Sequence, residues 1–256
     1  MFYEMEKTNL VADLPIKLGR DPIMEAVFEI RFQSDIATLS ELLPGLLYTQ
    51  FNSEFGTPER LFAADLPPEL LESDPNLRYQ PRLRMKGDRF AILIGDRSII
   101  VSCSRPYSGW AEFRPVIFQV LDTLKRTNLI KVIERISLKY VNVLSAETLD
   151  EQFRLIQFKS TVGRHDLTTC ISTTAFEFIE DGLNNLIEIK SNASVRLPDG
   201  KTEKGLFISV DTINLAPRNF WDEQERHVDT VHQKEKEIFF GLLAEETISK
   251  LDPVWK

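Results

Sequence analysis

The sequence predicts an α+β protein built mainly on antiparallel sheet. Residues 24–32 alternate strictly, with apolar side chains at the even positions and charged ones at 25, 29 and 31, which is typical of a strand with one wet face. Turn-forming Gly-Asp and Asp-Gly pairs separate further strand patterns, which indicates hairpins. Helical patterns follow runs of strands and do not alternate with single strands, which favours α+β over a doubly wound α/β fold.

The first half of the chain contains four more strand patterns. Three follow one another closely, separated by Gly87-Asp88 and Gly95-Asp96, whose turn-forming residues argue for hairpins. The fourth is long and has apolar residues on one face. The expected ranges are 78–86, 89–95, 98–104 and 132–145.

Two helical patterns belong to the same half. Residues 36–52 carry leucines at helical spacing around Pro44, so a kink or two short helices are expected. A second helix is expected to begin with Ser108 as its N-cap, and Trp110 and Phe113 open its apolar stripe. These two aromatic residues, with Tyr107 beside them, are expected either to anchor the helix on the sheet or to form an exposed binding surface.

The second half has the same outline. Strands are expected at 152–160, 167–180, 184–197 and 204–215, and the hairpin signals Asp181-Gly182 and Asp199-Gly200 lie between the last three. A helix is expected from Asp222, with Glu225 completing a capping box, and a short final helix covers 244–250.

The order of elements divides the chain into three parts. Residues 1–21 form an irregular lead-in, 22–145 a first α+β half and 146–256 a second half, packed as one domain. Within the first half, 56–77 holds four prolines and is the best candidate for a mobile loop. Each half reads as hairpin-linked strands followed by a helix, which suggests an internal duplication, although the residues themselves do not repeat.

Composition and sequence patterns indicate the cellular compartment and the kinds of partner to expect. The net charge of −8 argues against a nucleic-acid binder, which usually shows a basic field. Cys103 and Cys170 lie in apolar strand patterns and are expected to be reduced, buried thiols. The sequence shows no signal-peptide pattern and no apolar run long enough for a membrane helix, so a cytoplasmic protein without a membrane partner is expected.

Several strings together carry a family resemblance: PIMEAVFEIRF, PYSGWAEF, IERISLKYVNVL, LFISVDTINL and TVHQKEKEIFFGLLAEE. From about Pro15 to Pro253 the chain resembles a sporadically distributed, mostly bacterial family of uncharacterised proteins of about 250 residues, known chiefly as a numbered profile. The resemblance implies no activity. The sporadic distribution suggests a mobile or phage-defence locus, where folds of the SecB-like chaperone kind occur, and the strand-run-plus-helix order here is compatible with such a fold.

Motifs of common enzymes are missing from the sequence. It contains no phosphate-binding loop, no dinucleotide-binding glycine turn, no zinc-protease motif and no nucleophile elbow. His227 and His232 are five residues apart on one expected helix, so they cannot both ligate one metal ion. No metal and no cofactor is therefore expected.

One pattern offers an enzymatic alternative. Asp181 in a hairpin turn, followed by Glu188 and Lys190 on the next strand, resembles the acid and E-x-K arrangement of metal-dependent nucleases. Two carboxylates would hold Mg²⁺ and the lysine would assist the attacking water. The alternative interpretation is an ordinary solvated strand face, because Asn192, Ser194 and Arg196 continue the same face.

A second candidate site is a polar cluster of Arg135, Tyr140, Asn142 and Asp211. These residues occur in otherwise apolar strands, so they either satisfy one another in the core or line a ligand cleft. Together, the missing motifs and the long one-face-apolar strands predict a non-catalytic binding protein. It is expected to act as a chaperone-like or antitoxin-like accessory factor whose partner is the product of a neighbouring gene, and its strand edges could also support a homodimer.

Overall fold

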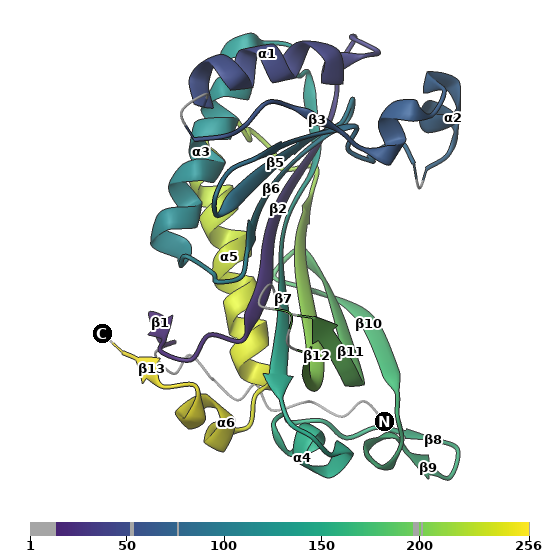
Figure 1. Ribbon diagram of the computed structural model, residues 1–256, viewed down its shortest axis with the longest axis vertical. Helices are drawn as coiled ribbons and strands as arrows, with labels where there is room; N and C mark the ends of the chain where they lie inside the picture. Colours follow the sequence, from purple (N-terminus) through teal and green to yellow (C-terminus); the bar gives the residue numbers. More distant parts are fainter. Residues whose placement is uncertain (1–13, 52–53, 76, 197–199, 201, 256) are drawn as a thin grey trace.

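A computed structural model describes residues 14–51, 54–75, 77–196, 200 and 202–255. Its centre is a nine-stranded sheet with the order β10-β11-β12-β7-β2-β6-β5-β4-β3, in which every neighbouring pair is antiparallel (Figure 1). The predicted α+β class with mostly antiparallel sheet is therefore confirmed.

The strands of this sheet are β2 (Ile23–Gln33), β3 (Glu59–Arg60), β4 (Leu83–Lys86), β5 (Phe90–Ile94), β6 (Ser98–Ser104), β7 (Val132–Ser145), β10 (Thr173–Glu180), β11 (Leu183–Arg196) and β12 (Thr202–Leu215). Two small ribbons pair β1 (Lys17–Leu18) with β13 (Pro253–Val254) and β8 (Thr161–Val162) with β9 (His165–Asp166). The helices are α1 (Leu39–Phe51), α2 (Pro68–Ser73), α3 (Trp110–Thr127), α4 (Leu149–Arg154), α5 (Gln224–Leu242) and α6 (Glu245–Lys250), with short 3₁₀ turns at Phe62–Asp65 and Leu167–Thr169.

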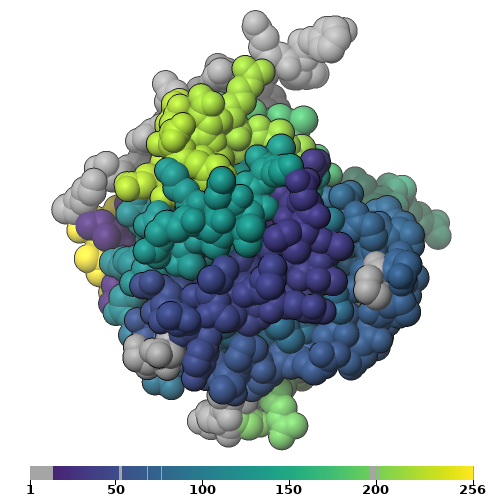
Figure 2. Space-filling view, turned by 90° about the horizontal axis from the view of Figure 1, so that it is seen from above, coloured from purple at the N-terminus to yellow at the C-terminus, as the bar shows by residue number. Residues whose placement is uncertain are grey.

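One face of the sheet carries the core. Helices α1, α3 and α5 lie on this side in Figure 1, and α1 lies between α3 and the segment around α2 when seen from the end of the sheet (Figure 2). Alternate side chains such as Phe28 on β2 and Leu138 on β7 meet Phe113 and Leu121 of α3, and all four are at most 1% exposed. Burying each contributes roughly 1.5–3 kcal/mol.

The opposite face, here called the open face, has no described helix over β7, β12, β11 and β10 (Figure 1). It carries the other alternate set of side chains, including Glu29, Arg135 and Asp211. The strict alternation in the sequence therefore separates a helix-covered face from an open one.

Residues 152–160 are not a strand, contrary to the sequence prediction. The chain forms α4 there, because Thr148 and Glu151 make a reciprocal capping box: the Glu151 amide donates to Thr148 Oγ1 at 3.3 Å, and the Thr148 amide donates to Glu151 Oε2 at 2.9 Å. The Thr-x-x-Glu spacing is the signal that could have identified this helix.

Both predicted helix caps are also wrong. Gly109, at φ 89°, is the N-cap of α3, and Ser108 Oγ lies 3.3 Å from Cys103 Sγ instead. Helix α5 begins after Glu223 without a side-chain cap, and Glu225 forms an ion pair with Arg114 of α3 at 3.1 Å. In each case the side chain that the sequence pattern predicted as part of the cap makes a contact with another element instead.

Several boundaries differ from the predicted ones. Residues 36–52 contain one helix that continues through Pro44, and 56–77 contains β3, a 3₁₀ turn and α2. The strands expected at 78–86 and 167–180 start at Leu83 and Thr173, and the lead-in includes β1. The Asp181-Gly182 turn is confirmed, since φ is 51° and 78° at its two residues, whereas Asp199 lies outside the described residues.

Both cysteines are free thiols; Cys103 is buried and Cys170 is half-buried. Of the helices in the described ranges, none is long and apolar enough to cross a membrane.

Gly205 sets how closely β12 can approach β7. A Cβ at this position would lie 2.1 Å from the carbonyl oxygen of Leu144, so we expect Gly205→Ala to force the strands apart and to cost about 1–3 kcal/mol of unfolding free energy. Gly241→Ala in α5 is the matched control, because nothing lies within 4 Å of its Cβ, and it should be neutral or stabilising by up to about 1 kcal/mol. Urea unfolding of both variants decides, and equal midpoints would contradict the role of Gly205.

Candidate binding surface on the open face

Strand register brings charged side chains together at the centre of the open face. Glu29 on β2 pairs with Ser137 on β7, and Arg31 pairs with Arg135. Two residues beyond Ser137 on β7, Lys139 pairs with Asp211 on β12. Directly paired residues share a face of the sheet, so all these side chains project to the same side.

Arg135 is the hub of the resulting network. Its Nη2 lies 3.3 Å from Glu29 Oε2 and 3.4 Å from Asp211 Oδ2, and it donates to Ser137 Oγ at 3.1 Å. Glu29 Oε2 also accepts a hydrogen bond from Arg31 Nε at 2.9 Å. The guanidinium of Arg135 therefore holds two carboxylates from two different strands.

This network is largely buried although no described helix covers it. The side chains of Glu29, Asp211 and Arg135 are 11%, 14% and 19% exposed. Arg135 Nε and Asp211 Oδ1 have no hydrogen-bond partner in the described part of the chain. Buried polar atoms nearly always have partners, so the network leaves two polar atoms unsatisfied beneath the surface of the open face.

Burial and neighbouring charges shift the pKa of Asp211 in opposite directions. Burial raises the pKa of Asp211, Arg135 and Lys139 lower it, and the nearby charge of Glu29 raises it. The net direction is upward, so the ionised carboxylate costs more in the folded protein than in the unfolded chain.

An aromatic residue extends the network towards α2. The guanidinium of Arg31 lies over the ring of Tyr79, 4.5 Å from its centroid. The Tyr79 hydroxyl donates to Glu134 Oε2 at 2.9 Å, and both burial and this carboxylate raise the pKa of Tyr79. The polar band thus runs from β12 across the two central strands to the segment that follows α2.

Apolar side chains accompany the band on the same face. Leu186, Leu215 and Ile179 are 40%, 56% and 73% exposed. Their register places them with Glu177 and Asp211 on the open side of β10, β11 and β12. The open face therefore combines a charged centre with an apolar flank.

The predicted polar cluster is divided by the sheet. Arg135 and Asp211 lie on the open face, whereas Tyr140 and Asn142 point to the helix-covered face. Tyr140 is buried there, and its hydroxyl lies 2.8 Å from that of Tyr107. The sequence showed that each of these residues was polar in an apolar strand, but not that they belonged to opposite faces.

The aromatic corner at the start of α3 anchors the helix on the sheet. Trp110 stacks on His232 of α5, with ring centroids 3.8 Å apart and planes inclined by 3°. Tyr107 and Phe113 meet edge to face at 6.3 Å. Burial lowers the pKa of His232 to about 3, so the stacked imidazole is neutral. Of the two sequence interpretations, the geometry fits the anchor.

Helix α5 carries a buried acid, Glu235, that the sequence patterns did not identify as a site residue. Glu235 is 4% exposed, and its Oε1 has no hydrogen-bond partner within the described ranges; the same holds for both amide atoms of Asn142. Burial, reinforced by the charge of Asp211, raises the pKa of Glu235 well above its ordinary value. In the sequence Glu235 occupies an apolar position of the helical pattern, which was the available signal.

The three residues of the nuclease pattern do not converge. Lys234 of α5 donates to Asp181 Oδ2 at 2.5 Å, whereas Glu188 pairs with Lys190 on its own strand at 3.0 Å. The strand rise puts about 17 Å between Leu183, next to the turn, and Glu188. In the part of the chain that the structure describes, no group of three or more His, Cys, Asp or Glu could hold a metal ion.

His227 has partners that explain its position. Its Nδ1 lies 3.2 Å from Asn214 Nδ2, and its Nε2 lies 2.9 Å from the carbonyl oxygen of Arg218. The imidazole thereby ties α5 to the turn that precedes it.

Comparison with known proteins adds no assignment to this geometry. No protein-family model matches the chain, and a search of curated proteins found no significant match. The family resemblance of the sequence therefore stays a prediction.

Arg135 should be needed to hold Glu29 and Asp211 on one face. We expect Arg135→Met to lower the unfolding free energy by about 1–3 kcal/mol, less than for a fully buried pair, because two carboxylates lose their shared cation. The triple variant that adds Glu29→Gln and Asp211→Asn should recover most of this loss. Urea unfolding measures both, and a triple variant no more stable than the single one would contradict the charge argument.

Glu235 should make stability fall with rising pH. An acid whose pKa is raised by folding stays protonated in the folded state while the unfolded chain ionises above about pH 4.5. The unfolding free energy of Glu235→Gln relative to wild type should therefore grow above pH 4.5, by about 1.4 kcal/mol per pH unit, until the folded pKa is reached. Denaturant unfolding from pH 5 to 9 tests this, and a difference independent of pH would contradict it.

Proposed function

We propose that this chain is a non-catalytic binding protein whose open face takes a polypeptide partner. The observation that carries the proposal is the charged network around Arg135, left uncovered by any described helix and flanked by exposed apolar side chains. Arginine and aromatic residues are enriched at protein interfaces. In this surface, Arg31, Arg135 and Tyr79 supply those groups.

The cellular role that fits best is that of a chaperone-like or antitoxin-like accessory factor of a mobile or phage-defence locus. This part of the proposal is supported by the family resemblance of the sequence. It is also supported by the described residues of the open face, which form no group of three or more His, Cys, Asp or Glu that could hold a metal ion. The partner would be the product of a neighbouring gene, and the protein would act in the cytoplasm.

We infer further that the two halves arose by duplication. Strand β2 pairs with β6, the last strand of the meander that follows it, and β7 pairs likewise with β12. Each group continues into a long helix, α3 or α5, and the two groups meet where β2 pairs with β7. The same four-strand-plus-helix order supports the comparison with SecB-like chaperones at the level of fold alone.

The nuclease alternative gains no supporting observation, because Asp181 contacts Lys234 of α5 whereas Glu188 and Lys190 pair with each other. A Mg²⁺-dependent cleavage of DNA or RNA by the purified protein that Glu188→Ala abolishes would restore it.

The binding proposal is tested by co-purification. The tagged protein, coexpressed with each neighbouring gene product in turn, should retain one of these products. The double variant Ile179→Lys, Leu186→Lys should weaken this retention at least about tenfold, because it places charge on the apolar flank. Leu42→Lys on α1 is the matched control, since this leucine is 50% exposed away from the open face. Equal retention by all variants would contradict the assignment of the surface, and the absence of any retained partner would contradict the proposed role.

A further inference from the structure

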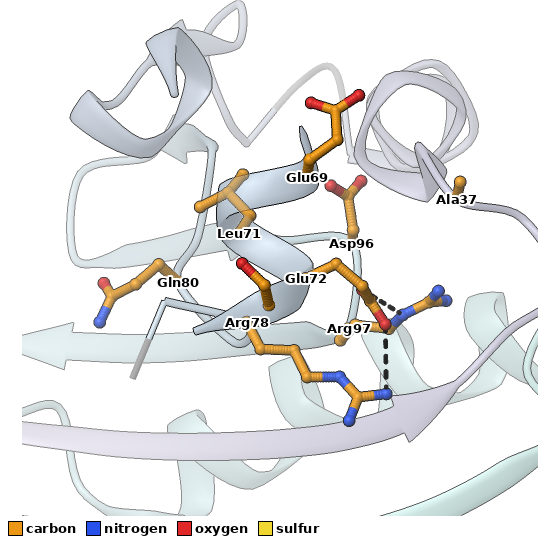
Figure 3. Close-up of a pocket in the computed structure, with 9 residues that line it drawn as sticks. Ala37, Glu69, Leu71, Glu72, Arg78, Gln80, Asp96 and Arg97 are labelled. Atoms are coloured by element: carbon orange, nitrogen blue, oxygen red, sulfur yellow. Dashed lines mark ion pairs between the residues drawn. The ribbon is translucent and has the colours of Figure 1, made fainter. Parts of the chain in front are cut away.

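A pocket of about 520 Å³ lies beneath α2, next to the turn between β5 and β6 (Figure 3). Two arginines line it from different segments: Arg78 follows α2, and Arg97 belongs to the turn. Figure 3 shows both side chains meeting Glu72 of α2. The pocket therefore places two guanidinium groups around one carboxylate.

Glu72 is a poor partner for these arginines. Arg78 Nη2 lies 3.5 Å from Glu72 Oε1, and Arg97 Nε lies 3.7 Å from Glu72 Oε2. Charge-assisted hydrogen bonds of this kind are normally about 2.7–2.9 Å long. The Glu72 side chain is also 55% exposed, so its two ion pairs are open to water and contribute little stability.

Backbone carbonyl groups hold Arg97 in place. Its Nη1 donates to the carbonyl oxygens of Ser34 at 2.7 Å and Ile36 at 3.3 Å, and its side chain is 12% exposed. The Nε atoms of Arg97 and Arg78 are buried and have no hydrogen-bond partner among the described residues. Both arginines thus keep a donor that Glu72 does not satisfy.

The other acids of the pocket do not supply the missing acceptor. Asp96 is engaged elsewhere, because it pairs with Arg82 at 2.9 Å and accepts a hydrogen bond from the Ser40 amide at 2.9 Å. For Glu69, the described part of the chain provides no ion pair to either arginine. Among the described pocket residues, Arg78 and Arg97 therefore pair only with Glu72, at 3.5 and 3.7 Å.

Helix α2 can release Glu72 at small cost. It has six residues and no side-chain hydrogen bond at its N-cap, and helices this short have little stability of their own. Leu71, which is 6% exposed, is the one buried side chain among those described for this helix.

We propose that this two-arginine pocket binds a carboxylate side chain of a polypeptide partner, and that Glu72 occupies the site in the free protein. A peptide is favoured over a free anion because the present occupant is itself a glutamate on a helix, and because the pocket far exceeds the size of one anion and has the apolar Leu71 in its wall. The proposal is independent of the function assigned to the open face.

The test uses the full-length protein and two labelled, amidated heptapeptides in fluorescence anisotropy. One copies residues 67–73, Pro-Pro-Glu-Leu-Leu-Glu-Ser, and the other carries Gln in place of both Glu. Glu72→Gln should bind the acidic peptide at least tenfold more tightly than wild type and should not bind the Gln peptide. Glu246→Gln on α6 is the matched control, because this glutamate is 81% exposed and does not line the pocket, and it should behave as wild type.

Addition of Arg78→Gln to the Glu72→Gln variant should abolish binding of the acidic peptide while the urea midpoint stays near that of Glu72→Gln. The proposal is overturned if Glu72→Gln binds no more tightly than wild type, if it binds both peptides equally, or if Arg78→Gln leaves binding unchanged. Calorimetry with inorganic phosphate separates the sources: phosphate binding to Glu72→Gln without peptide binding would overturn the assignment to a polypeptide.

Discussion

The pairing of β2 with β7 at the centre of the sheet is the constraint on which the rest of the structure depends. In this register Phe28 faces Leu138 beneath the helices, while Glu29 faces Ser137 on the open side. A slip of one residue would move Glu29 into the core and Phe28 to the open face, because side chains alternate along a strand. Burial of the apolar side chains of β2 and β7 beneath the helices therefore also determines which charged side chains lie on the open face.

The same register places two positively charged side chains next to each other on the open face. Arg31 and Arg135 are direct neighbours on paired strands, and like charges in this arrangement are destabilising. Glu29 lies between them and contacts both, at 2.9 and 3.3 Å. Asp211 balances the remaining charge of Arg135 from the next strand. The network is thus a consequence of strand pairing, and the side chains of Arg135 and Asp211 stay 19% and 14% exposed on the open face.

A structural feature could be predicted from the sequence where it depends on adjacent residues, and could not where it depends on tertiary contacts. The strand 132–145 and the Asp181-Gly182 turn were predictable, because alternation and positive φ are properties of a few adjacent residues. The division of Arg135 and Tyr140 between two faces was only partly predictable, since it also requires knowing which face the helices cover. The pocket of Arg78 and Arg97 was not predictable, because its residues meet only through the tertiary contacts of an irregular segment.

The location of the perturbed groups fits the proposed binding function. Strongly shifted pKa values often mark catalytic sites, but only where a substrate can reach them. Here the strongest shifts belong to Tyr140, His232 and Glu235, which are packed between α5, α3 and the sheet. The groups that a partner can reach on the open face are already paired with one another. Their charge can recognise a complementary surface, whereas proton transfer would first require the ion pairs around Arg135 to break.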